Sequence, residues 1–374
     1  MARLSELLSN VDLAALAGKA LVAEDRLAQI VAGAEPSMGE ARRIATALKL
    51  PMSALIAADP SAQPTRAELL FRGATRHGKT DLAAQRIAAR VDASMSLARN
   101  ADNTGTPWWW SKFERGDHTA EEAERNAATF RRLLHDDDQL GPLLSLPTIA
   151  TERMGVMLFV ISASEIDGAS AFLDGVPYVF VSARFQGRML FTLAHELGHL
   201  IAHHDPASSF AVVDEDVEAA RPNAERTREQ YADAFASALL MPQQGVGIAL
   251  KKVREIAGTA DKEVGDLEIN YLARIFGVSF WAAARRCEAL GVIPNGGAAA
   301  LNEHLVKQYG SAEKRAESAG LPPRPDVFFP PVPSVLVHSA VNQVRRGDLS
   351  LGRAAELLEM SMADILTLNA PTAH

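Results

Sequence analysis

The sequence of 374 residues contains a single cysteine, Cys287. One cysteine cannot form an internal disulfide, so the protein does not require an oxidising compartment. The same count excludes a zinc site that is built from several cysteines. Any metal site in this chain would therefore have to use histidine, aspartate or glutamate side chains.

Long apolar runs are also missing. Residues 1–18 include Glu6 and Asp12 and have no uninterrupted apolar segment of the kind found in signal peptides. The uncharged stretch at 237–250 contains proline and glutamine, and it is shorter than the ~18 residues that a membrane-spanning helix needs. We therefore expect a cytoplasmic protein with no membrane segment.

The sequence has no excess of positive charge. It carries 38 Lys and Arg residues against 46 Asp and Glu residues, which gives a formal net charge of -8. A chain of this charge is not a general binder of polyanions, although a local basic patch is compatible with it. Because 48% of the residues are hydrophobic and 22% are charged, the composition indicates a globular protein with a sizeable core.

The pattern of apolar residues predicts an α+β protein that is mostly helical. Residues 1–59 contain several short amphipathic segments with glycine at the stops, and Gly18 is expected to end the first helix. Around residue 155 the period changes, and short β-branched or aromatic segments bounded by glycine follow. We expect a helix-turn-helix domain at 1–59, a helical connecting region at 60–145, a domain with a small sheet at 146–293, a Pro-rich linker at 294–333 and a small helical domain at 334–374.

An HExxH motif follows the predicted strands on an amphipathic helix. It consists of His195, Glu196 and His199, with Leu197 and Gly198 between them. Residues four apart share one face of a helix, so both imidazoles can reach one metal ion. Glu196 points about 100° away, where it can act as a general base on a metal-bound water whose pKa is lowered to about 7.

A zinc site needs a third protein ligand, and three candidates remain open. The extended pattern HExxHxxGxxH would use Asp205, but Ala202 stands where that pattern needs glycine. His203 lies four residues past the second motif histidine, on the same helix. We favour Glu229 on the next helix, because Asp233 lies four residues later and can orient a ligating histidine. A fourth protein ligand, Asp205 or His203, would instead make the site structural.

Two stretches resemble the ImmA/IrrE family of metallopeptidases. They are RMLFTLAHELGHLIAHH at 188–204 and EQYADAFASALLMP at 229–242, in which Asp233 occupies the family's asparagine position. The resemblance implies a zincin-like fold at 146–293, Zn2+ held by His195, His199 and Glu229, and Glu196 as the catalytic base. It also implies an endopeptidase that cleaves a partner regulatory protein, typically a helix-turn-helix repressor.

Residues 13–58 contain LAALAG, a turn at Gly33–Pro36 and the run RRIATALKLPMSALI, and through these they resemble the Cro/C1-type (XRE) helix-turn-helix domain. The helix that would read DNA bases offers Arg26 and Gln29 as contacts, but Arg26 is its only basic residue. Because DNA readers normally neutralise several phosphates, this domain is poorly equipped for DNA. Weak DNA binding as a dimer and protein binding both remain open for it.

Other features leave further alternatives. The chain could be a DNA-binding transcriptional regulator or antitoxin that uses the peptidase fold as a sensor or toxin-binding surface. Its partner, a repressor or a toxin, is then expected to be encoded by a neighbouring gene, and a homodimer is compatible with either reading.

The segment 175–183 is a candidate edge strand for an extended peptide or simply core sheet. Three further features have open roles: Trp108–Trp110, the tail at 347–366 with a helix-turn-helix rhythm, and the oxyanion candidates His203, His204 and Tyr231.

Overall fold

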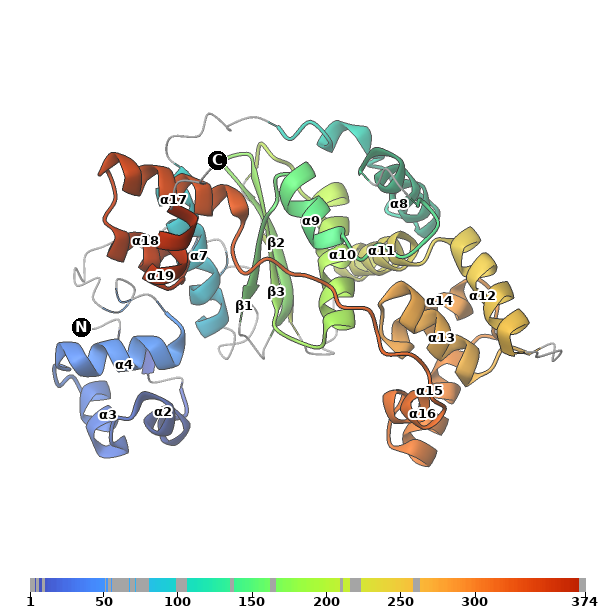
Figure 1. The fold of residues 1–374 in the computed structure, drawn as a ribbon, viewed down its shortest axis with the longest axis horizontal. Coiled ribbons are helices and arrows are strands. Elements are labelled where there is room, and N and C mark those ends of the chain that lie inside the picture. The colour runs from blue at the N-terminus through green and yellow to red at the C-terminus, as the bar shows by residue number, and fades with distance from the viewer. Residues whose placement is uncertain are drawn as a thin grey trace.

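The computed structural model describes residues 4, 7, 8, 11–50, 52, 55, 67, 71, 81–98, 106–134, 138–161, 166–208, 211–215, 223–257 and 263–369. Within these residues the protein is mostly helical and has one four-stranded mixed sheet, which is compatible with the predicted α+β class. The sheet lies at the centre of the molecule, with helices on both of its faces (Figure 1). In the described part of the chain, no helix is both long and apolar enough to cross a membrane.

The N-terminal unit is a small helical bundle. It comprises α2 (Leu13–Ala20), α3 (Glu24–Val31) and α4 (Met38–Leu48), which share a leucine-rich core. Asp12 caps α2 by accepting hydrogen bonds from the backbone N–H groups of Ala14 and Ala15. Ser37 and Glu40 form a capping box at the start of α4. Local sequence signals therefore define where α2 and α4 begin, whereas Ala23 before α3 provides no side-chain cap.

The expectation that Gly18 ends the first helix was wrong. Helix α2 continues through Gly18 to Ala20 and ends at Leu21, which adopts the left-handed conformation with φ 52°. A glycine in a helix costs about 1 kcal/mol relative to alanine, and burial of Leu16 and Ala20 on the inner face outweighs that cost. The turn that connects α2 to α3 therefore occupies residues 21–23.

The C-terminal segment also contains a pair of short helices. Helix α18 (Leu351–Leu358) has the same 8-residue length as α2, and α19 (Met362–Asn369) has the same 8-residue length as α3. Between them, Glu359 adopts the left-handed conformation with φ 51°. The helical rhythm of the tail thus corresponds to two helices joined by a tight turn, with α17 (Ser334–Arg346) preceding them.

The sheet consists of β1 (Met157–Ile161), β2 (Ile166–Leu173), β3 (Val176–Ser182) and β4 (Ala211–Glu215) in the order β1-β3-β2-β4. Strand β3 is parallel to β1 and antiparallel to β2, and β2 is antiparallel to β4. The candidate edge strand at 175–183 is therefore an inner strand, because β1 and β2 both pair with it. The edge next to β2 is formed by β4.

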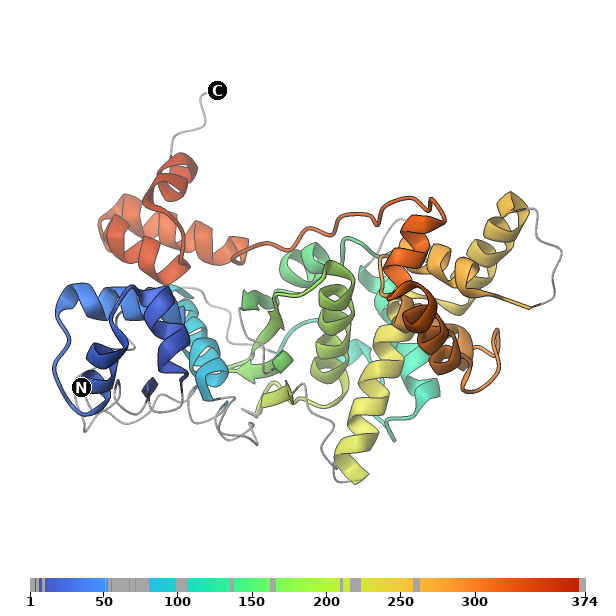
Figure 2. The same ribbon diagram turned by 90° about the horizontal axis from the view of Figure 1, so that it is seen from below.

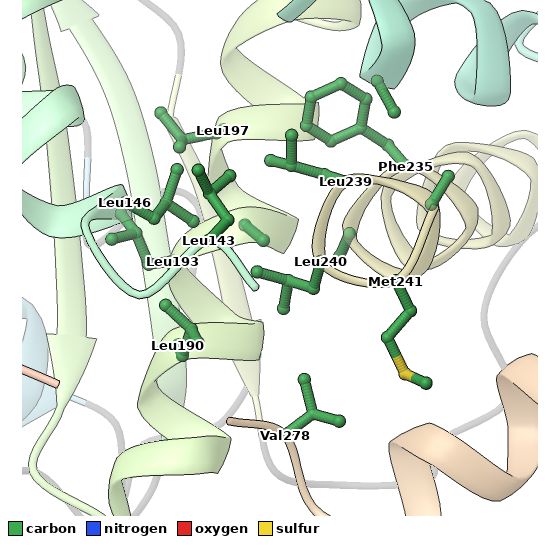
Figure 3. Packing of buried hydrophobic residues seen from close by; sticks show 14 of the residues in the cluster. Leu143, Leu146, Leu190, Leu193, Leu197, Phe235, Leu239, Leu240, Met241 and Val278 are labelled. Atoms are coloured by element: carbon green, nitrogen blue, oxygen red, sulfur yellow. The ribbon is translucent and has the colours of Figure 1, made fainter. Parts of the chain in front are cut away.

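One face of the sheet is covered by the helices that carry the predicted metal ligands. Helix α10 (Gln186–Ala202) packs on the sheet, α11 (Asn223–Leu240) packs on α10, and α8 (Ala120–Leu134) packs on α11. Leu193 and Leu197 of α10 lie opposite Leu239 and Leu240 of α11 in the close view of this core (Figure 3). This apolar packing fixes the spacing of the two helices.

The opposite face of the sheet is covered by α7 (Asp81–Ala98) together with α17, α18 and α19. Ser94 of α7 forms a 2.9 Å hydrogen bond with Tyr178 of β3, and Ser339 of α17 donates to the carbonyl of Leu97. Both views show the C-terminal helices beside α7 (Figures 1 and 2). The predicted C-terminal helical domain therefore shares its hydrophobic core with the sheet.

The predicted linker at 294–333 is only partly extended. After α12 (Gln243–Ala257), α13 (Asp266–Phe276) and α14 (Phe280–Ala289), the chain forms α15 (Gly297–Tyr309) and α16 (Ala312–Ser318). Alanine-rich sequence in α15 and a Ser311 cap on α16 favour helices there, whereas prolines keep 321–333 out of helix. This extended part crosses the molecule to α17 (Figure 2).

The three tryptophans anchor the segment that precedes α8. Each indole N–H donates to a backbone carbonyl: Trp108 to Arg153, Trp109 to Met154 and Trp110 to His204. Trp109 is fully buried and Trp108 is about half exposed, at 55%. Their role is structural packing next to the end of α10, and Trp110 begins the short helix η2 (Trp110–Lys112).

Candidate metal centre

The two motif histidines face each other from successive turns of α10. His195 Nε2 and His199 Nε2 are 3.0 Å apart, and both side chains are buried. The apolar residues of the opposite face, among them Leu197 and Ile201, lie in the main hydrophobic core. The helix thus presents two imidazole nitrogens to one point, as the spacing of the motif predicts.

Glu229 of α11 completes a three-residue cluster. Its Oε2 lies 3.5 Å from His195 Nε2, and its Oε1 lies 3.6 Å from His199 Nε2. One potential ligand atom from each of these residues lies within 4.8 Å of the others. Two imidazole nitrogens and one carboxylate are a donor set that suits zinc and leaves a fourth tetrahedral position open.

Gly198 brings α10 and α11 together at the cluster. A Cβ at this position would lie 3.1 Å from Phe235 Cδ1 and 3.2 Å from the Cα of Ala232, so a larger residue would push the helices apart. The glycine within the HExxH motif therefore allows Glu229 to approach the histidines.

Two buried arginines fix the C-terminal end of α11. Arg131 donates to the carbonyls of Leu239 at 2.7 Å and Leu240 at 3.5 Å, and Arg286 donates to that of Met241 at 2.8 Å. Burial lowers the pKa of Arg131 to about 10, which leaves it charged at neutral pH. Cations at a helix C-terminus satisfy its last carbonyls and stabilise it, so α11 is held at both the cluster and its end.

Glu196 lies on the side of α10 that faces the sheet and is fully buried. A Cβ on Gly168 of β2 would collide with the Glu196 carboxylate and would lie 2.7 Å from Thr192 Cγ2. The strand thus leaves room for the carboxylate only because residue 168 is glycine. Gly168 was not singled out from the sequence, because nothing local shows which strand residue faces the motif.

Each motif histidine has a different partner at its second ring nitrogen. His195 Nδ1 lies 2.9 Å from Asp233 Oδ1, as predicted for a carboxylate that orients a ligand. His199 Nδ1 lies 2.8 Å from His203 Nδ1. Burial lowers the pKa of His199 well below its ordinary value and lowers that of His203 to about 3, which favours the neutral form of both rings.

The other candidate ligands lie outside the cluster. His203 contacts His199 on the ring nitrogen that faces away from Glu229. Asp205 is exposed and accepts a hydrogen bond from the backbone N–H of Ala207. Among the described residues, only Glu229 therefore joins the two motif histidines.

The remaining oxyanion candidates are engaged elsewhere. Buried Tyr231 accepts a 2.7 Å hydrogen bond from Asn126 Nδ2, and burial raises its pKa to about 12. His204 is buried against Phe172, with its Nε2 3.3 Å from Ser170 Oγ. These contacts favour a packing role for both side chains.

His118 is a site residue that sequence reasoning missed. It has a φ of +56°, which is uncommon for a residue other than glycine, and its ring lies edge-on to that of His203 at a centroid distance of 4.6 Å. Its backbone N–H donates to buried Glu122, which holds the strained turn. The sequence offers no signal for this contact, because 85 positions separate the two histidines.

The predicted DNA contacts lie together on α3, but Arg26 is engaged within the N-terminal unit. Its guanidinium donates to Glu40 at 2.9 Å and to the carbonyl of Glu35 at 2.8 Å. Gln29 is exposed and accepts a longer contact of 3.4 Å from Arg26. The one basic group of this helix is therefore directed at its own fold.

Comparison with known proteins agrees with the geometry of the centre. No curated protein matches the chain. Residues 151–288, however, match the model of the M78 peptidase family that is described as the IrrE N-terminal-like domain, and this range includes the whole His195, His199 and Glu229 cluster. The central region of the chain is thus similar to the ImmA/IrrE metallopeptidases.

Proposed function

We propose that the protein is a zinc-dependent endopeptidase that cleaves a partner regulatory protein. The observation that carries this proposal is the convergence of His195 Nε2, His199 Nε2 and the Glu229 carboxylate within 3.0 to 3.6 Å, next to the buried carboxylate of Glu196. The match to a peptidase family over residues 151–288 supports it.

The chain's own residues supply the proton chemistry. Zinc held by the three ligands would supply Lewis acidity that makes a water molecule acidic near neutral pH. Glu196 takes the proton from the attacking water and passes it to the leaving amine, which is the work of a general base and then a general acid. Asp233 holds the ring of His195 in the orientation that directs Nε2 to the metal.

Strand β4 is the proposed binding edge for the substrate. Within the described residues it pairs with β2 alone, so its other edge can accept an extended peptide as an added strand. The substrate we propose is a helix-turn-helix repressor, as the family resemblance implies, and the neighbouring genes are the first place to look for it.

The decisive experiment combines metal analysis with cleavage. Purified wild-type protein is expected to contain zinc and to cleave the co-expressed repressor, whereas Glu196→Gln should retain zinc and lose about 10²- to 10⁴-fold in cleavage rate. Glu303→Gln, an exposed change on α15, is the matched control and should leave the rate unchanged. A wild-type protein without zinc, or unchanged cleavage by Glu196→Gln, would overturn the proposal.

The two short helices α2 and α3, joined by a turn at 21–23, are compatible with a second, regulatory role, as a DNA-binding regulator or antitoxin. Gel-shift experiments on the protein's own promoter region test it. A shift that persists in a His195→Ala, His199→Ala double variant supports the regulator, and no shift at low salt contradicts it.

A further inference from the structure

The contact between His199 and His203 lies outside the triad of proposed ligands but directly behind one of them. His199 has two ring nitrogens, of which Nε2 faces Glu229 and His195, and Nδ1 faces His203 Nδ1 at 2.8 Å. His195 uses a carboxylate, Asp233, in the corresponding place. The two ligands are therefore oriented by chemically different partners.

Hydrogen-bond chemistry determines the tautomer of each ring in this pair. A nitrogen that binds a metal needs its lone pair, so the proton of neutral His199 lies on Nδ1 and is donated to His203. His203 Nδ1 must then be the acceptor, and its own proton lies on Nε2. The His203 side chain thus acts on His199 as an acceptor in a fixed position.

Residues from other elements fix the ring of His203. The ring of Tyr231, on α11, lies edge-on to it at a centroid distance of 5.3 Å. The ring of His118, in the turn before α8, lies edge-on to it at 4.6 Å. Tyr231 is itself held by Asn126 and stacked on Phe235. His203, the residue that follows α10, is therefore restrained directly by α11 and by the turn before α8, and indirectly by α8 through Asn126.

The second ring nitrogen of His203, Nε2, is buried and forms no hydrogen bond among the described residues. A buried polar atom without a partner is unfavourable, and such an atom in a native structure calls for an explanation. The hydrogen bond that Nδ1 accepts from the ligand provides that explanation.

We propose that His203 is a positioning residue for the metal ligand His199: it accepts the Nδ1 proton of that ring and so directs Nε2 to the metal. This inference rests on the proposed zinc centre. It assigns the histidine that could have served as a ligand to a role one step removed from the metal.

The test measures zinc affinity of the full-length protein by competition with a chromophoric chelator. His203→Leu removes the acceptor and keeps an apolar side chain of similar size, and we expect zinc affinity to fall about 10- to 100-fold. His203→Asn keeps an acceptor oxygen in the δ position and should stay within a few-fold of wild type. His304→Leu, an exposed histidine on α15, is the control and should change nothing.

The visible spectrum of the cobalt-substituted proteins provides a second readout, because it reports ligand geometry without any substrate. We expect His203→Leu to alter it and His203→Asn to preserve it. If His203→Leu does not fold, the NMR spectrum of the imidazole nitrogens in the wild-type protein decides. Protons on Nδ1 of His199 and Nε2 of His203 support the proposal, and the reverse tautomers overturn it.

Two failures can be told apart. Wild-type protein that binds no zinc overturns the proposed function and this inference with it. Wild-type protein that binds zinc with an affinity that neither His203 variant changes overturns only the inference. Equal losses in His203→Leu and His203→Asn also overturn it, because they would indicate packing rather than an acceptor.

Discussion

The candidate metal centre and the N-terminal unit use polar groups in opposite ways. In the centre, His195, His199 and Glu229 come from two helices and direct their polar atoms at one another across 3.0 to 3.6 Å. In the N-terminal unit, Arg26 directs its guanidinium at Glu40 and at a backbone carbonyl. The convergence of two imidazoles and a carboxylate adds little to the stability of the fold, whereas the contacts of Arg26 stabilise the N-terminal unit.

The two sets of contacts differ in what they imply about ligand binding. If the Nδ1 protons of His195 and His199 are directed at Asp233 and His203, the two Nε2 atoms face each other with lone pairs, which is unfavourable unless a cation joins them, so their convergence indicates a ligand. An arginine that caps its own domain predicts no ligand. Variants that disturb each set of contacts should therefore affect different properties, which can be measured separately.

The largest effect is expected from removal of the third ligand. Glu229→Ala leaves two histidines, which are too few for a stable zinc site, so zinc should be lost on dialysis and cleavage should fall to background. Arg26→Ala should retain both zinc and cleavage. Metal content per chain, measured for the two purified variants in parallel, checks the comparison. Stoichiometric zinc in Glu229→Ala would place the third ligand elsewhere.

Gly168→Ala should affect the proposed general base, Glu196, without affecting zinc binding. The added methyl group would occupy the position of the Glu196 carboxylate, so the rate of cleavage should fall by about 10²-fold or more while zinc content is unchanged. Gly352→Ala on α18 is the matched control, because a Cβ there meets nothing within 4 Å. Full activity of Gly168→Ala would show that the strand does not constrain Glu196.

Local pattern was sufficient to predict the parts of the centre that lie on single helices. The i, i+4 spacing placed both histidines on one face of α10, and the spacing of Glu229 and Asp233 placed on α11 the two carboxylates that lie next to the histidine rings. The overall α+β class followed from the change in apolar period at residue 155. These signals are periodic, so they can be read without knowing which elements meet.

Contacts between distant elements could not be predicted. Gly168 faces Glu196, and His118 faces His203, only because the sheet and the turn before α8 pack against α10. Helix α2 likewise passed Gly18 because tertiary burial outweighed a local stop signal. Strand order decided that β4, and not β3, forms the edge beside β2.

A smaller effect is expected at Asp233. Asp233→Asn weakens the acceptor that orients His195, and loss of such partners typically lowers metal affinity 10- to 100-fold. Because the Asp233 side chain is 64% exposed, water can partly replace it, and we expect a change of about 10-fold. Zinc competition measures it, with Asp364→Asn on α19 as control. An unchanged affinity would mean that His195 is held by packing alone.

The smallest effect concerns the N-terminal unit and its pH dependence. The hydrogen bond from Arg26, with backbone and side-chain donors of Ser37, lowers the pKa of Glu40 to about 2. A carboxylate whose pKa is depressed on folding adds stability above its ordinary pKa of 4.5, and this contribution is lost as the pH falls toward 2.

Arg26→Ala should raise the pKa of Glu40 toward its ordinary value and shift the acid unfolding of this unit slightly to higher pH. Carboxyl chemical shifts in an NMR titration follow both changes. Because the two side chains keep 32% and 17% of their surface exposed, water screens the pair, so the shift in stability should be small and zinc content should not respond to it. A loss of zinc on changing Arg26 would join the two regions into one functional unit and remove the contrast between them.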